Sequence, residues 1–306
     1  MLSVIIPAYN EEKNIELVIK SVDSTLTKAN IPYEIIFVDD GSKDNTREII
    51  KTFIPKYPIT LEGFSRNFGK EAAINCGLHS AKGEVAVIFD ADLQFPTDTI
   101  VEMYRLWEEG YEVIEGEKIR RQKEGIIYKL GANTFYKLLK KFGNVDLKNA
   151  TDFKMLDRKV IDTLVAMPER NVFFRALSNW VGFKRTRVLF KVEDRRFGTS
   201  KWNFMKLSSY AISNLTSYTT LPMQFVTLAG TIFLIFSIGL GIHTLYIFFI
   251  GEALGGFTTV ILLLLIIGSI MMLSLGIIGY YLAKIYTELL HRPMYIVQEE
   301  LKNSEE

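Results

Sequence analysis

Disulfide bonds cannot stabilise this chain, because its 306 residues include a single cysteine, Cys76. One cysteine fits a reducing compartment and a packed thiol. Charge of one sign is not in excess either: the net charge of +1 does not favour binding to nucleic acid. The three histidines are expected to pack rather than to catalyse. No basic segment or cleavage site precedes the first apolar run, LSVIIP, so no secretory signal is predicted.

Charged residues are also missing from two long stretches, 223–250 and 257–283. Each is longer than the roughly 20 residues that span a bilayer, so we expect two transmembrane helices. The link between them, GEALGG (251–256), has no Lys or Arg. Basic residues flank the pair instead: Lys201, Lys206, Lys284 and Arg292. The positive-inside rule therefore predicts a hairpin in the cell membrane with both chain ends in the cytoplasm.

This distribution divides the chain into four parts. They are a cytoplasmic α/β domain (1–200), a juxtamembrane interfacial segment (201–222), the helical hairpin (223–283) and a cytoplasmic tail (284–306). Segments 171–183 and 202–220 mix aromatic residues with few charges, which predicts interfacial helices.

Strand and helix patterns alternate through the first part. Strands are expected at 3–7, 34–39, 60–64, 85–89 and 112–115, with helices at about 12–28, 45–54, 70–80 and 97–108. This alternation predicts a mostly parallel, doubly wound sheet. Ligands bind beyond the carboxyl ends of the strands in such sheets, so the polar motifs that follow four of the strands should converge on one cleft.

The most informative motif is VIFDADLQFP (87–96). Strand residues i and i+2 share a face, so Asp90 and Asp92 can close on one divalent cation. Mg²⁺ and Mn²⁺ prefer oxygen ligands and usually hold substrate phosphates as well. Taken alone, the pair is explained equally well by a solvated turn.

Each of two earlier motifs has two possible interpretations, one functional and one structural. Polar residues of PAYNEE (7–12) can meet a base or ribose, or can form a turn whose acids complement a helix dipole. In VDDGS (38–42), Asp39 and Asp40 can accept hydrogen bonds from a uracil N–H and ribose hydroxyls. An Asp-Gly turn ahead of a helix is the alternative.

The third strand is followed by SRNFGKEAA (65–73). Arg66 and Lys70 lie near a helix N-terminus, where a phosphate binds favourably. A solvated basic helix start is the alternative. Each motif has an ordinary explanation, but chance does not explain all four at successive strand ends.

Together with TDFKMLDR (151–158) and R-x-x-G-x-SKW (195–202), these motifs resemble the family 2 inverting glycosyltransferases of the GT-A fold. They are most similar to the polyprenyl-phosphate glycosyltransferases, a group that includes dolichol-phosphate mannose synthase and bacterial undecaprenyl-phosphate glucosyltransferases. The likeness covers nearly the whole chain, including the hairpin and RPMYIV (292–297). It implies a Rossmann-like catalytic domain on a membrane anchor.

The resemblance also implies a site. A nucleotide-sugar donor would be held by Pro7, Ala8, Tyr9, Glu11, Asp39, Asp40, Arg66, Lys70 and Asp90. Asp90 and the catalytic Asp92, with Gln94, would bind Mg²⁺ or Mn²⁺, which neutralises charge on the leaving nucleoside diphosphate. The acceptor would be a polyprenyl phosphate, whose anionic oxygen needs little help from a base. Positioning and electrostatics should therefore dominate catalysis.

Two later motifs fit the acceptor side of this resemblance. Asp152 matches an acidic position near the reaction centre and would orient the acceptor or act as a base. An ion pair with Lys154 or Arg158 is the alternative. A clamp on the acceptor phosphate would consist of Arg195, Ser200 and Lys201. The same residues can instead form a basic patch against anionic lipid heads.

The sequence departs from the family pattern at three positions. Relatives often carry G-x-R-x-x-R after the fifth strand, where this chain has Lys118. Lys154 stands where arginine is common, and Phe95 where relatives have a non-aromatic residue. Lysine supplies charge but no bidentate fork, so Lys118 and Lys154 are left out of the predicted site.

The resulting hypothesis is a metal-dependent enzyme that transfers one hexose from UDP-glucose to undecaprenyl phosphate at the cytoplasmic membrane face. UDP-GlcNAc and GDP-mannose are the alternative donors. The lipid-linked product would go to a flippase and a later lipid-dependent glycosyltransferase that modifies wall polymer or surface polysaccharide, and the thin anchor favours a homo-oligomer. A processive polysaccharide synthase would carry Q-x-x-R-W and more helices, and a non-catalytic membrane scaffold would not need the acidic pair.

Overall fold

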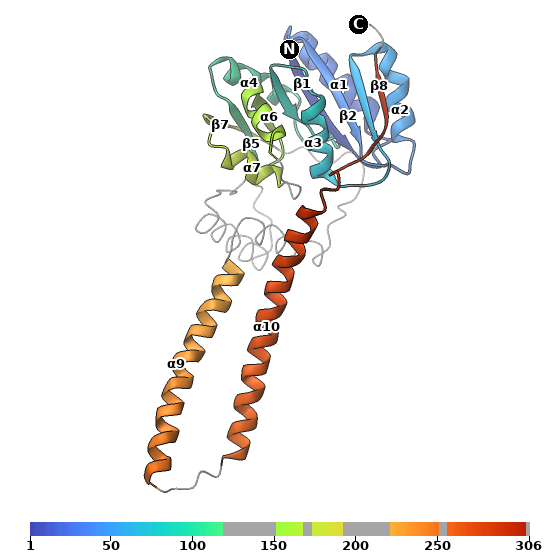
Figure 1. Cartoon of the computed structure of the whole chain (residues 1–306). Helices are drawn as coiled ribbons and strands as arrows, with labels where there is room; N and C mark the ends of the chain where they lie inside the picture. Colours follow the sequence, from blue (N-terminus) through green and yellow to red (C-terminus); the bar gives the residue numbers. More distant parts are fainter. Residues whose placement is uncertain (119–150, 168–172, 192–220, 251–255, 304–306) are drawn as a thin grey trace. The chain divides into compact units, whose positions relative to one another are not determined.

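The computed structural model describes residues 1–118, 151–167, 173–191, 221–250 and 256–303 (Figure 1). The chain forms two compact units, Met1–Asn203 together with Pro293–Glu306, and Phe204–Arg292. The last part of the sequence therefore belongs to the same unit as the first.

The first unit is built on one eight-stranded sheet within the described residues, in the order β7-β5-β6-β4-β1-β2-β3-β8. The strands are β1 (Leu2–Ala8), β2 (Tyr33–Asp39), β3 (Ile59–Phe64), β4 (Val85–Ile88), β5 (Val113–Lys118), β6 (Lys154–Asp157), β7 (Arg185–Phe190) and β8 (Val297–Lys302). Strands β1 to β4 are parallel to one another, and β7 is parallel to β5. The antiparallel pairs are β4 with β6, β5 with β6 and β3 with β8. The mostly parallel, doubly wound sheet is thus confirmed.

Both faces of this sheet are buried because its central strands are apolar at nearly every position. Alternate residues point to opposite faces: Val4 and Ile6 lie in one core, and Ile5 lies in the other. The first core is covered by α1 (Ile15–Lys28), α2 (Thr46–Phe53) with a short 3₁₀ turn η1 (Ile54–Lys56), and α4 (Asp98–Glu108). The second is covered by α3 (Lys70–Ser80), α6 (Arg158–Val165) and α7 (Phe174–Trp180).

The second unit contains two long apolar helices, α9 (Leu221–Ile250) and α10 (Phe257–Leu289). Both predicted helices are therefore present as helices. Among the described residues, one stretch, Ile266–Leu289, is long and apolar enough to cross a membrane by length and composition, and Met223–Phe233 is a shorter apolar helix. That both helices cross a membrane stays a prediction.

Two expectations need correction. The prediction of an interfacial helix over 171–183 was wrong for α7, because Phe174, Ala176 and Leu177 are buried in the second core instead of facing outward. The other such segment, 202–220, lies outside the described residues. The expected tail, 284–306, also contains structure that was not predicted: α10 runs to Leu289, and β8 then pairs with β3.

Candidate active site

The carboxyl ends of the parallel strands bring the four sequence motifs together. The register places Ala8 opposite Asp39, and Asp39 opposite Gly63. The loops that follow are joined to one another, because the backbone N–H of Asn10 donates to the Ser42 hydroxyl at 2.9 Å. The N–H of Phe68 donates to Asp40 Oδ1 at 2.6 Å. The predicted convergence of these loops on one edge is confirmed.

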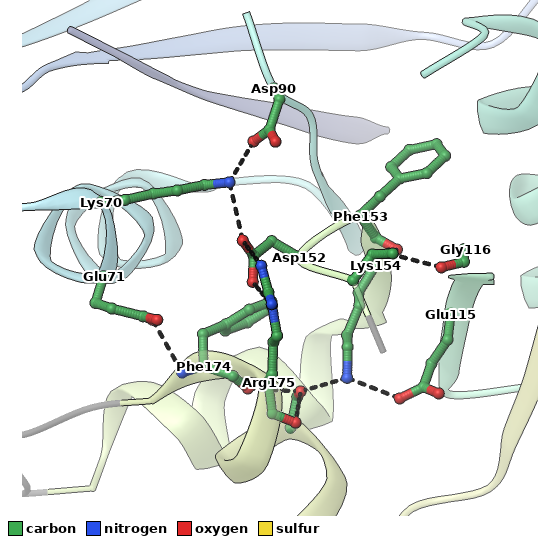
Figure 2. A network of polar contacts seen from close by, with 12 residues as sticks. Lys70, Glu71, Asp90, Glu115, Gly116, Asp152, Phe153, Lys154, Phe174 and Arg175 are labelled. Atoms are coloured by element: carbon green, nitrogen blue, oxygen red, sulfur yellow. Dashed lines mark hydrogen bonds and ion pairs between the residues drawn. The ribbon is translucent and has the colours of Figure 1, made fainter. Parts of the chain in front are cut away.

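At this edge Asp90 and Asp152 lie opposite each other. Strand β4 runs antiparallel to β6 with Val87 opposite Met155, so Asp90, which follows β4, and Asp152, which precedes β6, lie at the same end of this strand pair. Two facing carboxylates repel each other. The ammonium group of Lys70 lies between them, with Nζ 2.6 Å from Asp90 Oδ1 and 2.9 Å from Asp152 Oδ2 (Figure 2).

A second cation, Arg175 of α7, forms two hydrogen bonds with the Asp152 carboxylate. Its Nε lies 2.6 Å from Oδ1 and its Nη2 lies 2.8 Å from Oδ2. Burial alone would raise the pKa of Asp152, but Lys70 and Arg175 hold that pKa well below its ordinary value. Burial opposes a charged Lys70, yet Asp90 and Asp152 raise the pKa of its ammonium group above the usual range. Asp152 and Lys70 are therefore both charged near neutral pH.

Glu71, next to Lys70 in the first turn of α3, ties this cluster to α7. Its Oε2 accepts a hydrogen bond from the N–H of Phe174 at 2.9 Å (Figure 2). That N–H belongs to the first residue of α7 and has no partner within its own helix. Burial first, and then the charge of Asp152, raise the pKa of Glu71 to about 7.

The acidic pair has the donor set that a hard cation needs. The Asp90 side chain is 25% exposed and Asp92 is partly buried, so their carboxylates remain reachable. Within the described residues, no group of three or more His, Cys, Asp or Glu side chains is arranged to hold a metal. A site of this kind fits Mg²⁺ or Mn²⁺ only if phosphates and waters complete the shell, which is how Mg²⁺ usually binds.

An aromatic cluster supports the loop that carries Asp92. The Phe95 ring stacks on Phe153 with centroids 4.8 Å apart and meets Phe190 edge-on at 5.2 Å. The loop itself turns sharply, because Leu93 has a φ of 55°. Since Phe153 follows Asp152 directly, the contact between Phe95 and Phe153 joins the loop that carries Asp92 to the segment that carries Asp152. This contact gives a physical reason for the departure from the family pattern there.

The two aspartates of VDDGS are buried and bonded within the protein. Asp39 Oδ1 accepts from the N–H of Ser42 at 3.1 Å, and Oδ2 accepts from Arg47 Nε at 2.7 Å. Asp40 accepts from the N–H groups of Phe68 and Gly69. Burial raises the pKa of Asp40, and these N–H donors oppose that rise. Such contacts are structural, and a role in donor binding stays a prediction.

The other predicted donor residues lie on the same edge. Pro7 and Ala8 end β1, and Tyr9 follows them. Glu11 Oε2 accepts from Asn14 Nδ2 at 2.6 Å, beside the start of α1. The exposed Arg66 places its guanidinium 4.6 Å from the centroid of the Phe68 ring. The predicted acceptor clamp, Arg195, Ser200 and Lys201, lies outside the described residues.

Lys154 and Arg158 do not pair with Asp152, so that explanation of Asp152 was wrong. Lys154 is fully buried and donates to Glu115 Oε1 at 2.7 Å and to Ser178 Oγ at 2.8 Å (Figure 2). Arg158 binds the carbonyls of Ala81 and Gly83, which precede β4 at the opposite edge of the sheet. Leaving Lys154 out of the site agrees with its structural contacts.

Two residues of this charged region, Arg175 and Glu71, escaped the sequence reasoning, and a third, Lys118, was considered and left out of the predicted site. Arg175 is the only charged residue within 171–183, and a single charge in an apolar helix was the available signal. Lys118 ends β5 and lies with Nζ 5.5 Å from the Phe95 centroid. Burial lowers the pKa of Lys118, and Asp90 and Asp92 oppose that effect, so this lysine lies close to the same charged cluster.

Comparison with known proteins identifies the family. Residues 3–165 match the model described as glycosyl transferase family 2. The chain belongs to this family. An uncharacterized glycosyltransferase of Synechocystis sp. (sll0501) is 36% identical over 301 residues, which cover 97% of this chain and 95% of that protein. The bactoprenol glucosyl transferase of Shigella phage SfV is 32% identical and covers 98% of both chains.

A further relative is the prophage bactoprenol glucosyl transferase homolog of Escherichia coli (strain K12), 32% identical over 97% of this chain and 98% of its own length. The relatives therefore match the hairpin and the C-terminal segment as well as the domain that the family model covers. The resemblance drawn from the motifs is confirmed. The protein is a family 2 glycosyltransferase, and the charged cluster of Lys70, Asp90, Asp152 and Arg175 is its candidate active site.

Proposed function

We propose that this glycosyltransferase moves one glucose from UDP-glucose to undecaprenyl phosphate, with inversion, at the cytoplasmic face of the cell membrane. The observation that carries the proposal is the Asp90–Lys70–Asp152–Arg175 cluster at the carboxyl edge of the sheet, next to Asp92. Relatives named bactoprenol glucosyl transferase, which match over nearly their full length, support a lipid phosphate acceptor and a glucosyl donor.

The donor would occupy the edge formed by the first three motifs. Pro7, Ala8, Tyr9, Glu11, Asp39 and Asp40 would surround the nucleoside, and Arg66 would face the diphosphate. Asp90, Asp92 and Gln94 would hold Mg²⁺ or Mn²⁺, and a bound cation would neutralise charge on the leaving diphosphate. Lys70 lies within reach of the same phosphates, because it already contacts Asp90.

Asp152 would orient groups rather than remove a proton. Both of its carboxylate oxygens are bonded to cations, and its lowered pKa makes it a weak base. A phosphate acceptor is already anionic near neutral pH and needs no deprotonation. The arrangement instead holds Lys70 and Arg175 in fixed positions, where they stabilise negative charge at little cost in reorganisation.

The membrane part of the proposal rests on composition. Two charge-free stretches, 223–250 and 257–283, would cross the bilayer, with the catalytic unit and both termini in the cytoplasm. Arg195, Ser200 and Lys201 would bind the acceptor phosphate at the membrane surface. We further propose that a homo-oligomer forms and that a flippase and a lipid-dependent glycosyltransferase consume the product.

Purified protein incubated with undecaprenyl phosphate and a panel of radiolabelled nucleotide sugars tests this proposal. Label from UDP-glucose should enter the organic phase as a single-sugar lipid, whereas UDP-GlcNAc and GDP-mannose should give much less. Label transfer from either alternative sugar alone would replace the donor assignment. Polymeric product would revive the processive synthase, and no transfer from any donor would favour a scaffold.

A further inference from the structure

Arg47, in the first turns of α2, bridges the ends of two neighbouring strands. Its Nε donates to Asp39 Oδ2 at 2.7 Å, and its Nη2 donates to the Phe64 carbonyl at 2.8 Å. Asp39 ends β2 and Phe64 ends β3. The guanidinium therefore lies across the carboxyl edge, next to Asp39, which is predicted to contact the nucleoside.

Room for this guanidinium exists only because residue 63 is glycine. A Cβ at Gly63 would lie 2.9 Å from Arg47 Cζ and 3.1 Å from Nε. The Asp39 side chain is fully buried and that of Arg47 is 19% exposed, so solvent does little to weaken the pair. A planar fork satisfies both acceptors at once, which the single ammonium group of lysine cannot do in the same geometry.

A carboxylate of the C-terminal strand lies near Arg47. Glu299 of β8 is paired in register with Gly63. Its carboxylate lies 3.9 Å from Arg47 Nη1 and 2.9 Å from Lys51 Nζ. The same segment is fixed to the end of β3, where the N–H of Ser65 donates to the Ile296 carbonyl at 3.0 Å.

Stacking adds to this attachment. The Tyr295 ring lies on Phe64 with centroids 5.0 Å apart and an interplanar angle of 12°. The segment that follows α10 is thus part of the support for the donor edge, although about 230 residues separate the two in sequence.

We propose that Arg47 is a positioning residue for the nucleotide donor: it fixes the Asp39 carboxylate, and β8 fixes Arg47 through Glu299. This inference rests on the proposed function, in which Asp39 binds the nucleoside. Each carboxylate oxygen can accept more than one hydrogen bond. Ser42 and Arg47 donate to one oxygen each and thereby fix the position of the buried carboxylate at the end of β2.

The test compares Arg47→Lys with Arg158→Lys, using calorimetric binding of UDP to the full-length protein and steady-state kinetics. Arg158 is a matched control, because its guanidinium also bridges acceptors, the carbonyls of Ala81 and Gly83, at the opposite edge. Arg47→Lys should raise the Kd for UDP and the KM for the donor about tenfold, while kcat at saturating donor changes less than about threefold. Arg158→Lys should leave both constants within about twofold of the wild-type values.

A double-mutant cycle with Asp39→Asn separates positioning from general damage. If Arg47 acts through Asp39, then adding Arg47→Lys to Asp39→Asn should raise the Kd less than about twofold further. Fully additive effects, or wild-type UDP binding by Arg47→Lys alone, would overturn the inference. If the wild-type protein itself binds no UDP, or if Asp39→Asn binds it normally, the proposed donor site fails instead, and this inference fails with it.

Glu299→Gln, compared with Glu300→Gln, tests the part played by β8 and serves if Arg47→Lys does not fold. Glu300 is the neighbouring residue on the same strand and pairs with Lys302. Glu299→Gln should raise the donor KM about twofold to threefold, and Glu300→Gln should not change it. Equal values for the two variants would remove β8 from the inference.

Discussion

The carboxylate of Asp152 and the guanidinium of Arg175 form a two-point ion pair, with N–O distances of 2.6 and 2.8 Å. Asp152 lies two residues before the first residue of β6, Lys154, and Arg175 lies in α7. Ser178, one turn further along α7, contacts Lys154, two residues along the chain from Asp152. Helix α7 is therefore joined to β6 by matching polar side chains, since i and i+3 share a helix face and i and i+2 share a strand face.

Replacing Arg175 with lysine keeps the charge but removes the second hydrogen bond to Asp152. We expect Arg175→Lys to lower kcat about tenfold, because Asp152 and Lys70 lose a fixed partner. Arg185→Lys is the matched control, since Arg185 bonds Asn179 of the same helix on the exposed side. Single-turnover transfer rates measure the effect, and equal rates for the two variants would exclude Arg175 from the active cleft.

The buried pair of Lys154 and Glu115 should matter for stability rather than for chemistry. Lys154→Met leaves the Glu115 carboxylate, which is 3% exposed, without its closest cation. We expect a loss of about 3–5 kcal/mol in the free energy of unfolding, and a smaller loss in Lys154→Met/Glu115→Gln. Thermal unfolding in detergent measures the stability of the single and the double variant. The control is Lys20→Met, which removes the cation of an exposed ion pair with Glu16. A single variant as stable as the wild type would contradict the assignment.

Glu71 predicts a pH dependence of stability. Its pKa in the folded protein is raised to about 7 from an ordinary 4.5, so the folded state binds the proton more tightly than the unfolded state. The contribution of Glu71 to stability is therefore fully present below about pH 4.5 and falls as the pH rises to about 7. Glu71→Gln should flatten this part of the curve of unfolding temperature against pH. An unchanged slope would show that Glu71 ionises normally.

The sequence predicted those parts of the fold whose signals are local. Strands β1 to β4 are short apolar runs, and one polar motif follows each of them. Both the existence of these strands and the common edge of their loops could therefore be inferred. Strand β8, VQEELK, carries three charges in six residues and gains strand character by pairing with β3, more than 230 residues earlier. Such non-local pairing leaves no periodic signal.

The site was predictable to the same extent. Asp90, Asp92 and Lys70 lie in motifs beside strand ends, and the structure pairs Lys70 with Asp90 and leaves Asp92 partly exposed two residues further on. Arg175 could not be assigned, because its function depends on how α7 packs against β6. An apolar helix with one arginine reads equally well as a membrane-surface helix, and only burial of Phe174 and Leu177 decides between the two.

The most direct test of the central claim is transfer of labelled glucose from UDP-glucose to undecaprenyl phosphate by Asp92→Asn, compared with Asp98→Asn. Asp98 is an exposed aspartate at the start of α4, six residues away. Asp92→Asn should insert into membranes normally and lose at least about a thousandfold in transfer rate, because a cation bound at the acidic pair would lose a carboxylate ligand where charge develops. Asp98→Asn should transfer label at the wild-type rate. Near-normal transfer by Asp92→Asn would contradict the account.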